Sequence, residues 1–207
     1  LYALNPKQSV HVYATSGDGI FQSTNRGRQW VARNTDLAGT KINAVASVPT
    51  QPLTLYISTL KNGVFQSTDA GQSWTPKSTG LLDMFIPALT VDPTNPALRY
   101  AATGAGVFTS HDAGTRWPAA NTGIPAGAVV GSLNVDPTEP KTLYAGTDRG
   151  VFRKTTAGAR WTASNTGLPH TNVEVLALDP HNPQTLYVGI YSGLFKTTDD
   201  GPNWVRL

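Results

Sequence analysis

The sequence predicts an all-β protein, and three observations lead to that fold class. A tryptophan recurs at intervals of 44, 43, 44 and 43 residues. A phenylalanine lies nine positions before each tryptophan, and a tyrosine lies eight or nine positions before each phenylalanine. No segment shows a sustained helical period with caps, so helix should be scarce. The chain is therefore expected to repeat one small β-unit that cannot bury its hydrophobic faces alone.

One unit is expected to hold four short strands, as the last copy illustrates. The runs 173–180, 185–190, 193–198 and 203–207 are rich in Val, Leu, Tyr and Phe, and Gly, Pro, Asp and Asn bound them. Four antiparallel strands repeated about every 44 residues match a β-propeller blade. A β-solenoid is the alternative, although its coils are usually shorter.

The length of 207 residues favours one domain, because the copies fill nearly the whole chain. The expected blades span approximately 1–38, 39–82, 83–125, 126–169 and 170–207. The first copy begins inside its first strand and the last ends with its fourth, so we expect either a five-bladed ring or part of a larger propeller. Adjacent apolar pairs such as Val64-Phe65, Val107-Phe108 and Leu194-Phe195 predict strands that are buried on both faces.

The composition excludes several classes of function. The chain has no cysteine, which excludes disulfides and thiolate metal sites. The formal net charge is only +3, and the cations alternate with polar residues, so no nucleic-acid partner is predicted. No apolar run is long enough to cross a membrane, so direct membrane insertion is not expected. No residues have metal-ligand or phosphate-loop spacing, and no metal or cofactor is predicted.

Each tryptophan closes an octet of similar pattern, Ser/Thr-x-Asp-x-Gly-x-x-Trp. The five octets are STNRGRQW (23–30), STDAGQSW (67–74), SHDAGTRW (110–117), KTTAGARW (154–161) and TTDDGPNW (197–204). An Asp in a tight turn can accept hydrogen bonds from nearby backbone N–H groups, and the octet glycine supplies a permissive φ. Asn and Thr replace the Asp in two octets, and neither is a carboxylate. A structural role is therefore expected for Asn25, Asp69, Asp112, Thr156 and Asp199.

The octets resemble the Asp-box, or BNR repeat, of β-propeller proteins. The wider unit is similar to xyloglucanase-type glycoside hydrolases, the sortilin ectodomain and photosystem II assembly factors of the stability-factor type. This resemblance implies that each octet forms the hairpin between strands three and four, on the face away from the usual binding site. It also implies a secreted, periplasmic or lumenal location. The octet tryptophans are expected to be buried between strands or blades: Trp30, Trp74, Trp117, Trp161 and Trp204.

If the repeated residues build the scaffold, the unrepeated loops of the other face are the candidates for binding. The loop 81–87 (LLDMFIP) places apolar residues beside an acid, which suits either a contact surface or packing across a neighbouring loop. The candidate binding residues on this face are Asp18, Lys61, Asp83, Met84, Phe85, Asp148, Arg149, His170, Glu174 and Tyr191.

Two functions follow from different classes of protein. The first is a non-enzymatic binding or assembly module that engages a protein or a glycan through its loop face. The alternative is a glycoside hydrolase of xyloglucanase-like type acting on β-glucan. That chemistry usually needs two carboxylates about 5 to 10 Å apart. Asp36 and Asp83 occupy equivalent inter-blade loops and are its candidate catalytic pair. The loops hold no tryptophan platform for sugar stacking, which favours the binding module.

Overall fold

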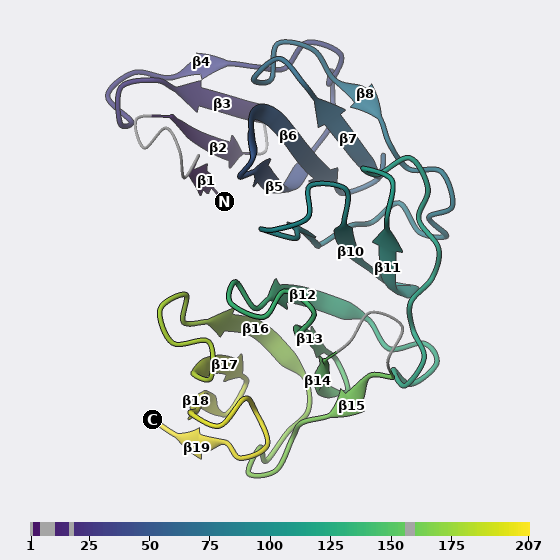
Figure 1. Cartoon of the computed structure of the whole chain (residues 1–207), viewed down its shortest axis with the longest axis vertical. Coiled ribbons are helices and arrows are strands. Elements are labelled where there is room, and N and C mark those ends of the chain that lie inside the picture. The colour runs from purple at the N-terminus through teal and green to yellow at the C-terminus, as the bar shows by residue number, and fades with distance from the viewer. Residues whose placement is uncertain (1, 5–10, 17–18, 156–159) are drawn as a thin grey trace. The chain divides into compact units, whose positions relative to one another are not determined.

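A computed structural model of the chain describes residues 2–4, 11–16, 19–155 and 160–207. Among these residues every regular element is a β-strand, and none is a helix (Figure 1). The strands form five sheets, and each sheet draws its strands from a single sequence copy. The predicted all-β class is confirmed.

Four of the sheets contain four strands that neighbour one another in chain order. The first holds β1 (Tyr2–Leu4), β2 (Val12–Ser16), β3 (Gly19–Ser23) and β4 (Val31–Ala32). The second holds β5 (Ile42–Val48), β6 (Gln51–Thr59), β7 (Val64–Ser67) and β8 (Thr75–Pro76). The fourth holds β12 (Val130–Val135), β13 (Leu143–Thr147), β14 (Gly150–Lys154) and β15 (Thr162–Ala163). The fifth holds β16 (Val173–Leu178), β17 (Leu186–Ile190), β18 (Gly193–Thr197) and β19 (Val205–Arg206).

The third sheet has three strands, β9 (Ala88–Val91), β10 (Arg99–Thr103) and β11 (Gly106–Ser110). A single bridge between Phe108 and Ala119 stands in place of its fourth strand. Pro118 follows the octet tryptophan here, and proline has no N–H to give to a β-ladder. Its carbonyl still accepts the Thr109 N–H at 3.0 Å, so half of the usual pairing survives.

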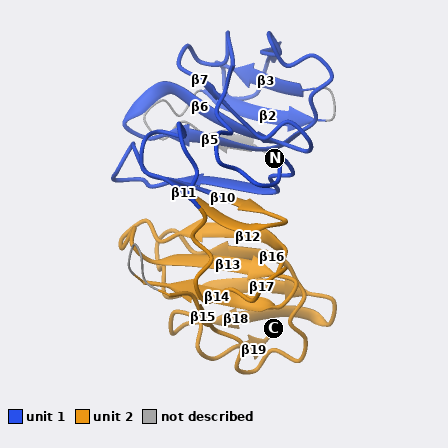
Figure 2. Cartoon of the chain, turned by 90° about the vertical axis from the view of Figure 1, so that its right-hand side faces the viewer, with its two compact units in different colours: residues 1–101, 109–118 blue, residues 102–108, 119–207 orange. Residues whose placement is uncertain are grey.

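The chain forms two compact units, residues 1–101 with 109–118 and residues 102–108 with 119–207 (Figure 2). In each unit, one hydrophobic cluster joins a sheet to the sheet of the following copy. The cluster of the first unit contains Tyr13, Ile20, Leu37, Ile42, Val45, Leu55, Ile57, Phe65 and Trp74. That of the second contains Tyr144, Val151, Val173, Leu176, Leu186, Val188, Ile190, Phe195 and Trp204. Neither sheet of such a pair could bury these side chains by itself.

The adjacent apolar residues in the third strand of each copy show how far burial on both faces of the sheet extends. Val64 and Val107 are fully buried, as predicted. Leu194 is 46% exposed, so the expectation is wrong for the last copy. Val151 holds the equivalent position and packs in a cluster with the copy that follows it. Leu194 belongs to the fifth copy and is not part of such a cluster.

Candidate functional site

The octet turns hold themselves together through side-chain oxygens. In the second octet, Asp69 accepts hydrogen bonds from the Ser67 hydroxyl at 2.7 Å and from the Ser73 N–H at 3.0 Å. The Ser73 hydroxyl donates to the other carboxylate oxygen of Asp69 at 2.6 Å. Ser67 in turn accepts the Gly71 N–H at 2.8 Å. The hydrogen bonds from Ser73 hold the pKa of Asp69 down, at about 2.

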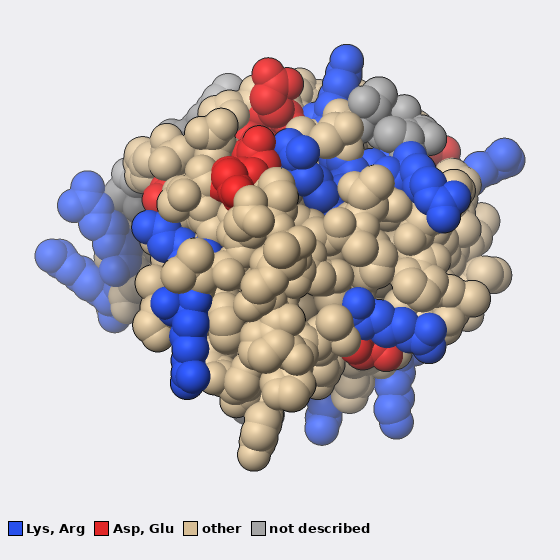
Figure 3. All heavy atoms as spheres, turned by 90° about the horizontal axis from the view of Figure 1, so that it is seen from below, with Lys and Arg blue, Asp and Glu red and all other residues tan. Residues whose placement is uncertain are grey.

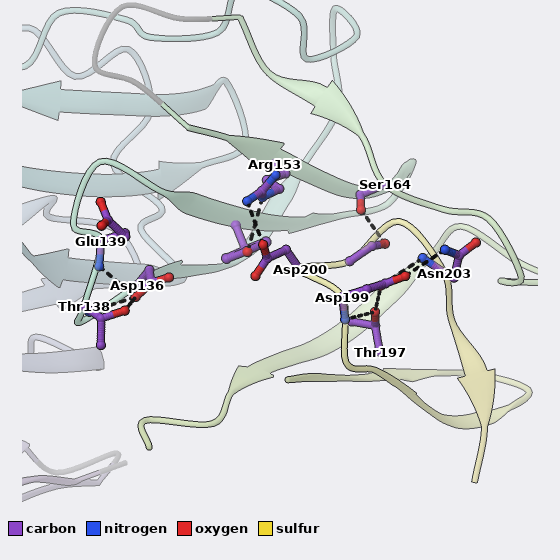
Figure 4. Close-up of polar contacts among 11 residues, drawn as sticks. Asp136, Thr138, Glu139, Arg153, Ser164, Thr197, Asp199, Asp200 and Asn203 are labelled. Carbon is purple, nitrogen blue, oxygen red and sulfur yellow. Dashed lines mark hydrogen bonds and ion pairs between the residues drawn. The ribbon is translucent and has the colours of Figure 1, made fainter. Parts of the chain in front are cut away.

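The other described octets repeat this arrangement with different chemistry at the Asp position. Asp112 accepts from the Ser110 hydroxyl at 2.8 Å, and Asn25 accepts from the Ser23 hydroxyl at 3.0 Å through its amide oxygen. Because an amide oxygen can replace the carboxylate, the turn needs an acceptor rather than a charge. Asp199 likewise accepts from Thr197 and Asn203 (Figure 4). Thr156 lies outside the described residues.

Four of the five octet tryptophans connect each copy to the one before it. Their indole N–H groups donate to main-chain carbonyls 40 or 41 residues earlier. The pairs are Trp74 with Arg33 at 2.9 Å, Trp117 with Lys77 at 2.7 Å, Trp161 with Ala120 at 2.7 Å, and Trp204 with Ser164 at 2.8 Å. All four side chains are buried. These indoles are therefore part of the scaffold between successive sheets.

Trp30 departs from the expectation that all five tryptophans are buried, because 42% of it is exposed. The other four indoles lie against the strand-four exit of the preceding copy. Trp30 is the octet tryptophan of the first copy, and no described residue supplies the equivalent carbonyl to its indole.

Additional contacts join the fourth and fifth copies beside an octet turn. Arg153 forms an ion pair with Asp200 at 3.2 Å, and the Ser164 hydroxyl donates to the Gly201 carbonyl (Figure 4). Elsewhere in the same unit, Asp136 accepts the N–H groups of Thr138 and Glu139 at 2.8 and 3.0 Å, which closes a turn between strands. These polar side chains therefore stabilise the scaffold.

Three loop segments of the first unit meet around the turn between β6 and β7. The Leu60 N–H donates to the Lys41 carbonyl at 2.9 Å, which joins the turn to the loop before β5. The Gly63 N–H donates to the Met84 carbonyl at 3.2 Å, and the Ile86 N–H donates to the Thr59 carbonyl at 3.1 Å. The loop 81–87 is therefore bound to the same turn from the other side.

A shallow cavity of about 190 Å³ opens among two of these segments. Its lining consists of Gly39, Lys41, Leu60, Lys61 and Asn62. Lys41 and Lys61 are both exposed, and the Asn62 amide reaches Thr40 at 3.4 Å. Lys61 was a predicted binding residue, and the structure adds Lys41 to it.

The loop 81–87 exposes its apolar side chains next to this turn. Leu82 is 78% exposed, Met84 39% and Phe85 38%, whereas Leu81 and Ile86 are buried and anchor the loop. Asp83 accepts the Phe85 N–H at 2.9 Å and so fixes the bend between them. We call Lys41, Lys61, Leu82, Met84 and Phe85 the lysine–apolar surface.

The predicted binding residues of the second unit fall in separate loops. Asp148 accepts the Val129 N–H at 2.9 Å, and Arg149 donates its N–H to the Thr147 hydroxyl at 3.0 Å. Tyr191 is 90% exposed at the turn between β17 and β18. His170 and Glu174 are also exposed. Asp148 and Arg149 share the turn between β13 and β14, and no hydrogen bond or ion pair links any two of these five residues in the described parts of the unit.

The two candidate catalytic acids have different neighbours. Asp36 accepts the backbone N–H of Trp74 at 3.5 Å, at the start of the outermost strand of the second sheet. Asp83 accepts from its own loop, as described above. No hydrogen bond between the two carboxylates is found in the described residues. Asp18, the remaining predicted binding residue, lies outside those residues.

Arg99 is a buried residue that the sequence reading missed. Its guanidinium lies 4.1 Å from the ring centroid of Tyr56 and donates to the Pro96 carbonyl at 2.7 Å. Burial lowers the pKa of Arg99, and within the described residues its Nε has no hydrogen-bond partner. A single cation in an otherwise apolar strand gives no periodic signal, so only coordinates could place it.

The charged surface and the acidic side chains suggest no further class of site. On the face drawn in Figure 3, most of the surface is uncharged, and Asp and Glu side chains lie next to some of the Lys and Arg side chains. In the described ranges, no three His, Asp or Glu side chains gather in a way that could hold a metal ion. The same ranges contain no helix able to span a bilayer.

Comparisons with solved structures decide the architecture. The xyloglucanase of glycoside hydrolase family 74 from Xanthomonas campestris superposes with a TM-score of 0.79 over 100% of this chain and 38% of its own, at 18% identity. YCF48 bound to a D1 peptide superposes with a TM-score of 0.62 over 99% of this chain and 80% of its own, at 16% identity. The chain is a β-propeller. No protein-family profile and no curated protein matches it.

Other neighbours of the propeller extend the range of functions that share this fold. An ancestral enzyme of glycoside hydrolase family 74 matches with a TM-score of 0.69 over 80% of this chain, at 23% identity. Extracellular domains from B. thetaiotaomicron match as well, one with a TM-score of 0.75 at 13% identity. The propeller described here spans between 24% and 44% of the hydrolase chains. At these identities the comparisons define the fold and leave the activity open.

Proposed function

We propose that the propeller is a non-enzymatic binding module that engages a segment of a partner protein through the lysine–apolar surface. One observation supports this proposal most strongly. Main-chain hydrogen bonds join three separate loops, and these loops hold exposed apolar side chains beside two lysines. Apolar groups held in contact with water on a fixed scaffold are typical of protein contact surfaces. A glycan-binding surface, in contrast, would be expected to offer aromatic faces for sugar stacking, and Phe85 is the only aromatic residue of this one.

Two kinds of structural neighbour support this proposal. YCF48 was solved with a bound peptide, so a propeller of this architecture can receive a polypeptide segment. The extracellular domains among the neighbours are the support for a secreted, periplasmic or lumenal location of this chain. Fractionation of cells that express the full-length protein tests that location, and recovery in the cytoplasm contradicts it.

The binding role is tested by selecting peptides from a displayed random library on the purified propeller. Peptides that bind the wild type should lose binding to Phe85→Ser. They should keep it on Val205→Ser, a matched control because Val205 is an exposed apolar residue of the second unit. Equal loss on both variants, or no loss on Phe85→Ser, overturns the assignment of the surface.

Xyloglucanase-like hydrolysis of β-glucan is the competing function, and its support is the fold of the family 74 neighbours. It would use Asp36, which accepts the Trp74 N–H, and Asp83, which accepts the Phe85 N–H. Release of reducing ends from xyloglucan or β-glucan by the wild type, lost in Asp36→Asn and Asp83→Asn, would replace our proposal. The absence of release over both substrates removes the competitor.

A further inference from the structure

The cavity between Lys41 and Lys61 gives the lysine–apolar surface a chemical preference. We propose that it takes the side-chain carboxylate of an Asp or Glu in the interior of the partner segment, while an adjacent apolar residue of that segment covers Leu82, Met84 and Phe85. This inference rests on the proposed binding function and specifies its partner.

The positive charge at the cavity is the first argument. Both lysines are exposed and both line the same cavity of about 190 Å³. In the described residues neither forms an ion pair within 4.0 Å. A volume of this size admits a carboxylate with one or two waters. Two ammonium groups at one opening favour an anionic group and raise the rate at which an acidic segment arrives.

The acids near the cavity do not cancel this charge. Asp83 lies in the neighbouring loop, and one of its oxygens accepts the Phe85 N–H at 2.9 Å. Asp36 lies in the loop before Lys41 and accepts the Trp74 N–H at 3.5 Å. Neither acid lines the cavity. The lysines are therefore the ionised groups that a ligand would meet there.

The main-chain donors around the cavity decide which carboxylate fits. A C-terminal carboxylate is typically captured by a nest of free backbone N–H groups. Here the Leu60 N–H donates to Lys41, the Asn62 N–H to the Thr59 hydroxyl, and the Gly63 N–H to Met84. The Leu60, Asn62 and Gly63 N–H groups are therefore already used, and the flexible lysine side chains of the cavity suit a side-chain carboxylate on a segment that continues in both directions.

The neighbouring apolar side chains decide what accompanies the acid. The Met84 carbonyl is bonded to the same turn that carries Lys61, so the apolar loop and the cavity lie on one continuous piece of surface. Surface ion pairs alone contribute little in water. Burial of an apolar side chain against Leu82, Met84 and Phe85 must therefore supply most of the affinity, and the lysines most of the selectivity.

The experiment compares peptide selections on the wild type and on the double variant Lys41→Glu/Lys61→Glu. The probe is a displayed random peptide library with blocked C-termini, so only side chains can carry carboxylates. Wild-type selections should be enriched in Asp or Glu next to an apolar residue. The charge-reversed variant should bind the same peptides at least tenfold more weakly and should select Lys or Arg instead.

The control variant is Arg28→Glu/Lys141→Glu, which changes the net charge equally at exposed positions outside the surface. It should bind like the wild type, and circular dichroism should show all three proteins folded. If Phe85→Ser abolishes binding but the lysine reversal does not, the binding function stands and the acidic preference is overturned. If neither change weakens binding, or if no peptide is selected at all, both proposals are overturned.

Two further outcomes also decide against the inference. Peptides that bind only with a free C-terminus would identify the terminal carboxylate as the ligand. Binding of an acidic polysaccharide such as polygalacturonate, lost in the lysine variant and unmatched by any peptide, would identify a glycan partner.

Discussion

The indole N–H of Trp117 donates a 2.7 Å hydrogen bond to the main-chain carbonyl of Lys77, forty residues earlier and one blade before it. The same kind of bond recurs at three other octet tryptophans. The repeat that marks the sequence is therefore a repeat of contacts between blades. The repeated side chains hold the blades together, so recognition of a partner must come from side chains that do not repeat.

Trp117→Phe should destabilise the protein by about 1–3 kcal/mol, because it leaves the partly buried Lys77 carbonyl without its indole donor. Trp30→Phe serves as the control. Since Trp30 is 42% exposed, its substitution should change the free energy of unfolding by about 0.5 kcal/mol or less. Urea unfolding measures both, and equal losses would contradict the contact-based explanation.

Asp69→Asn should reduce the dependence of stability on acid pH. The folded-state pKa of Asp69 is lowered to about 2, below its ordinary value of 3.8. The ionised carboxylate therefore contributes stability above pH 4, and that contribution is lost as the pH falls toward 2. Because the side chain is largely in contact with solvent, we expect about 1 kcal/mol or less.

Asn25 in the first octet shows that an amide supports the turn, so Asp69→Asn should be close to the wild type at pH 2. Asp69→Ala removes the acceptor and should be destabilised at every pH. Chemical unfolding at pH 2, 4 and 7 distinguishes them. A steeper acid dependence in the Asn variant than in the wild type would exclude this role for the charge.

Gly63→Ala should disturb the lysine–apolar surface more than Gly39→Ala. Both glycines have positive φ, +76° and +71°, where an added Cβ costs about 1–2 kcal/mol. A Cβ at Gly63 would in addition meet Met84 Sδ at 2.9 Å and the Ser78 hydroxyl, whereas a Cβ at Gly39 meets nothing within 4 Å. Gly63→Ala should therefore lower stability further than Gly39→Ala, as thermal unfolding would show, and it should weaken the binding of the selected peptides.

Arg99→Met should be neutral or stabilising, although the arginine is fully buried. No acid in the described residues pairs with it, and its Nε has no partner, so the hydrogen bond to Pro96 and the contact with Tyr56 offset only part of the desolvation cost that an apolar side chain of similar length would remove. Arg99→Ala instead opens a cavity beside Tyr56 and should cost about 2–5 kcal/mol. A large loss of stability in the Met variant would contradict this explanation and would indicate that a water molecule bonds to the Arg99 Nε.

The sequence predicts the blade because its information is periodic. Tryptophan, phenylalanine and tyrosine recur in register, and the hydrogen bonds of the tryptophan indoles recur with them. The left-handed φ of Ala70 and Ala113 was not predicted, because glycine at the next position already explained the turn. The exposure of Trp30 was missed for a similar reason: periodicity describes an average copy and says nothing of the first.

The candidate surface was predicted only in part. Lys61, Met84 and Phe85 were singled out because they interrupt the repeat. Their association with Lys41 depends on hydrogen bonds from Leu60 and Gly63 to other loops, and backbone pairing between loops leaves no pattern in residue types. The same limit applies to Asp36, whose contact with Trp74 follows from blade packing.

The direction of the indole bonds bears on how the molecule is made. Each of the four buried octet tryptophans donates to a carbonyl of an earlier residue, which leaves the ribosome before the tryptophan does. A nascent blade thus finds its docking surface already synthesised, and assembly can proceed from the first blade toward the last without waiting for the end of translation.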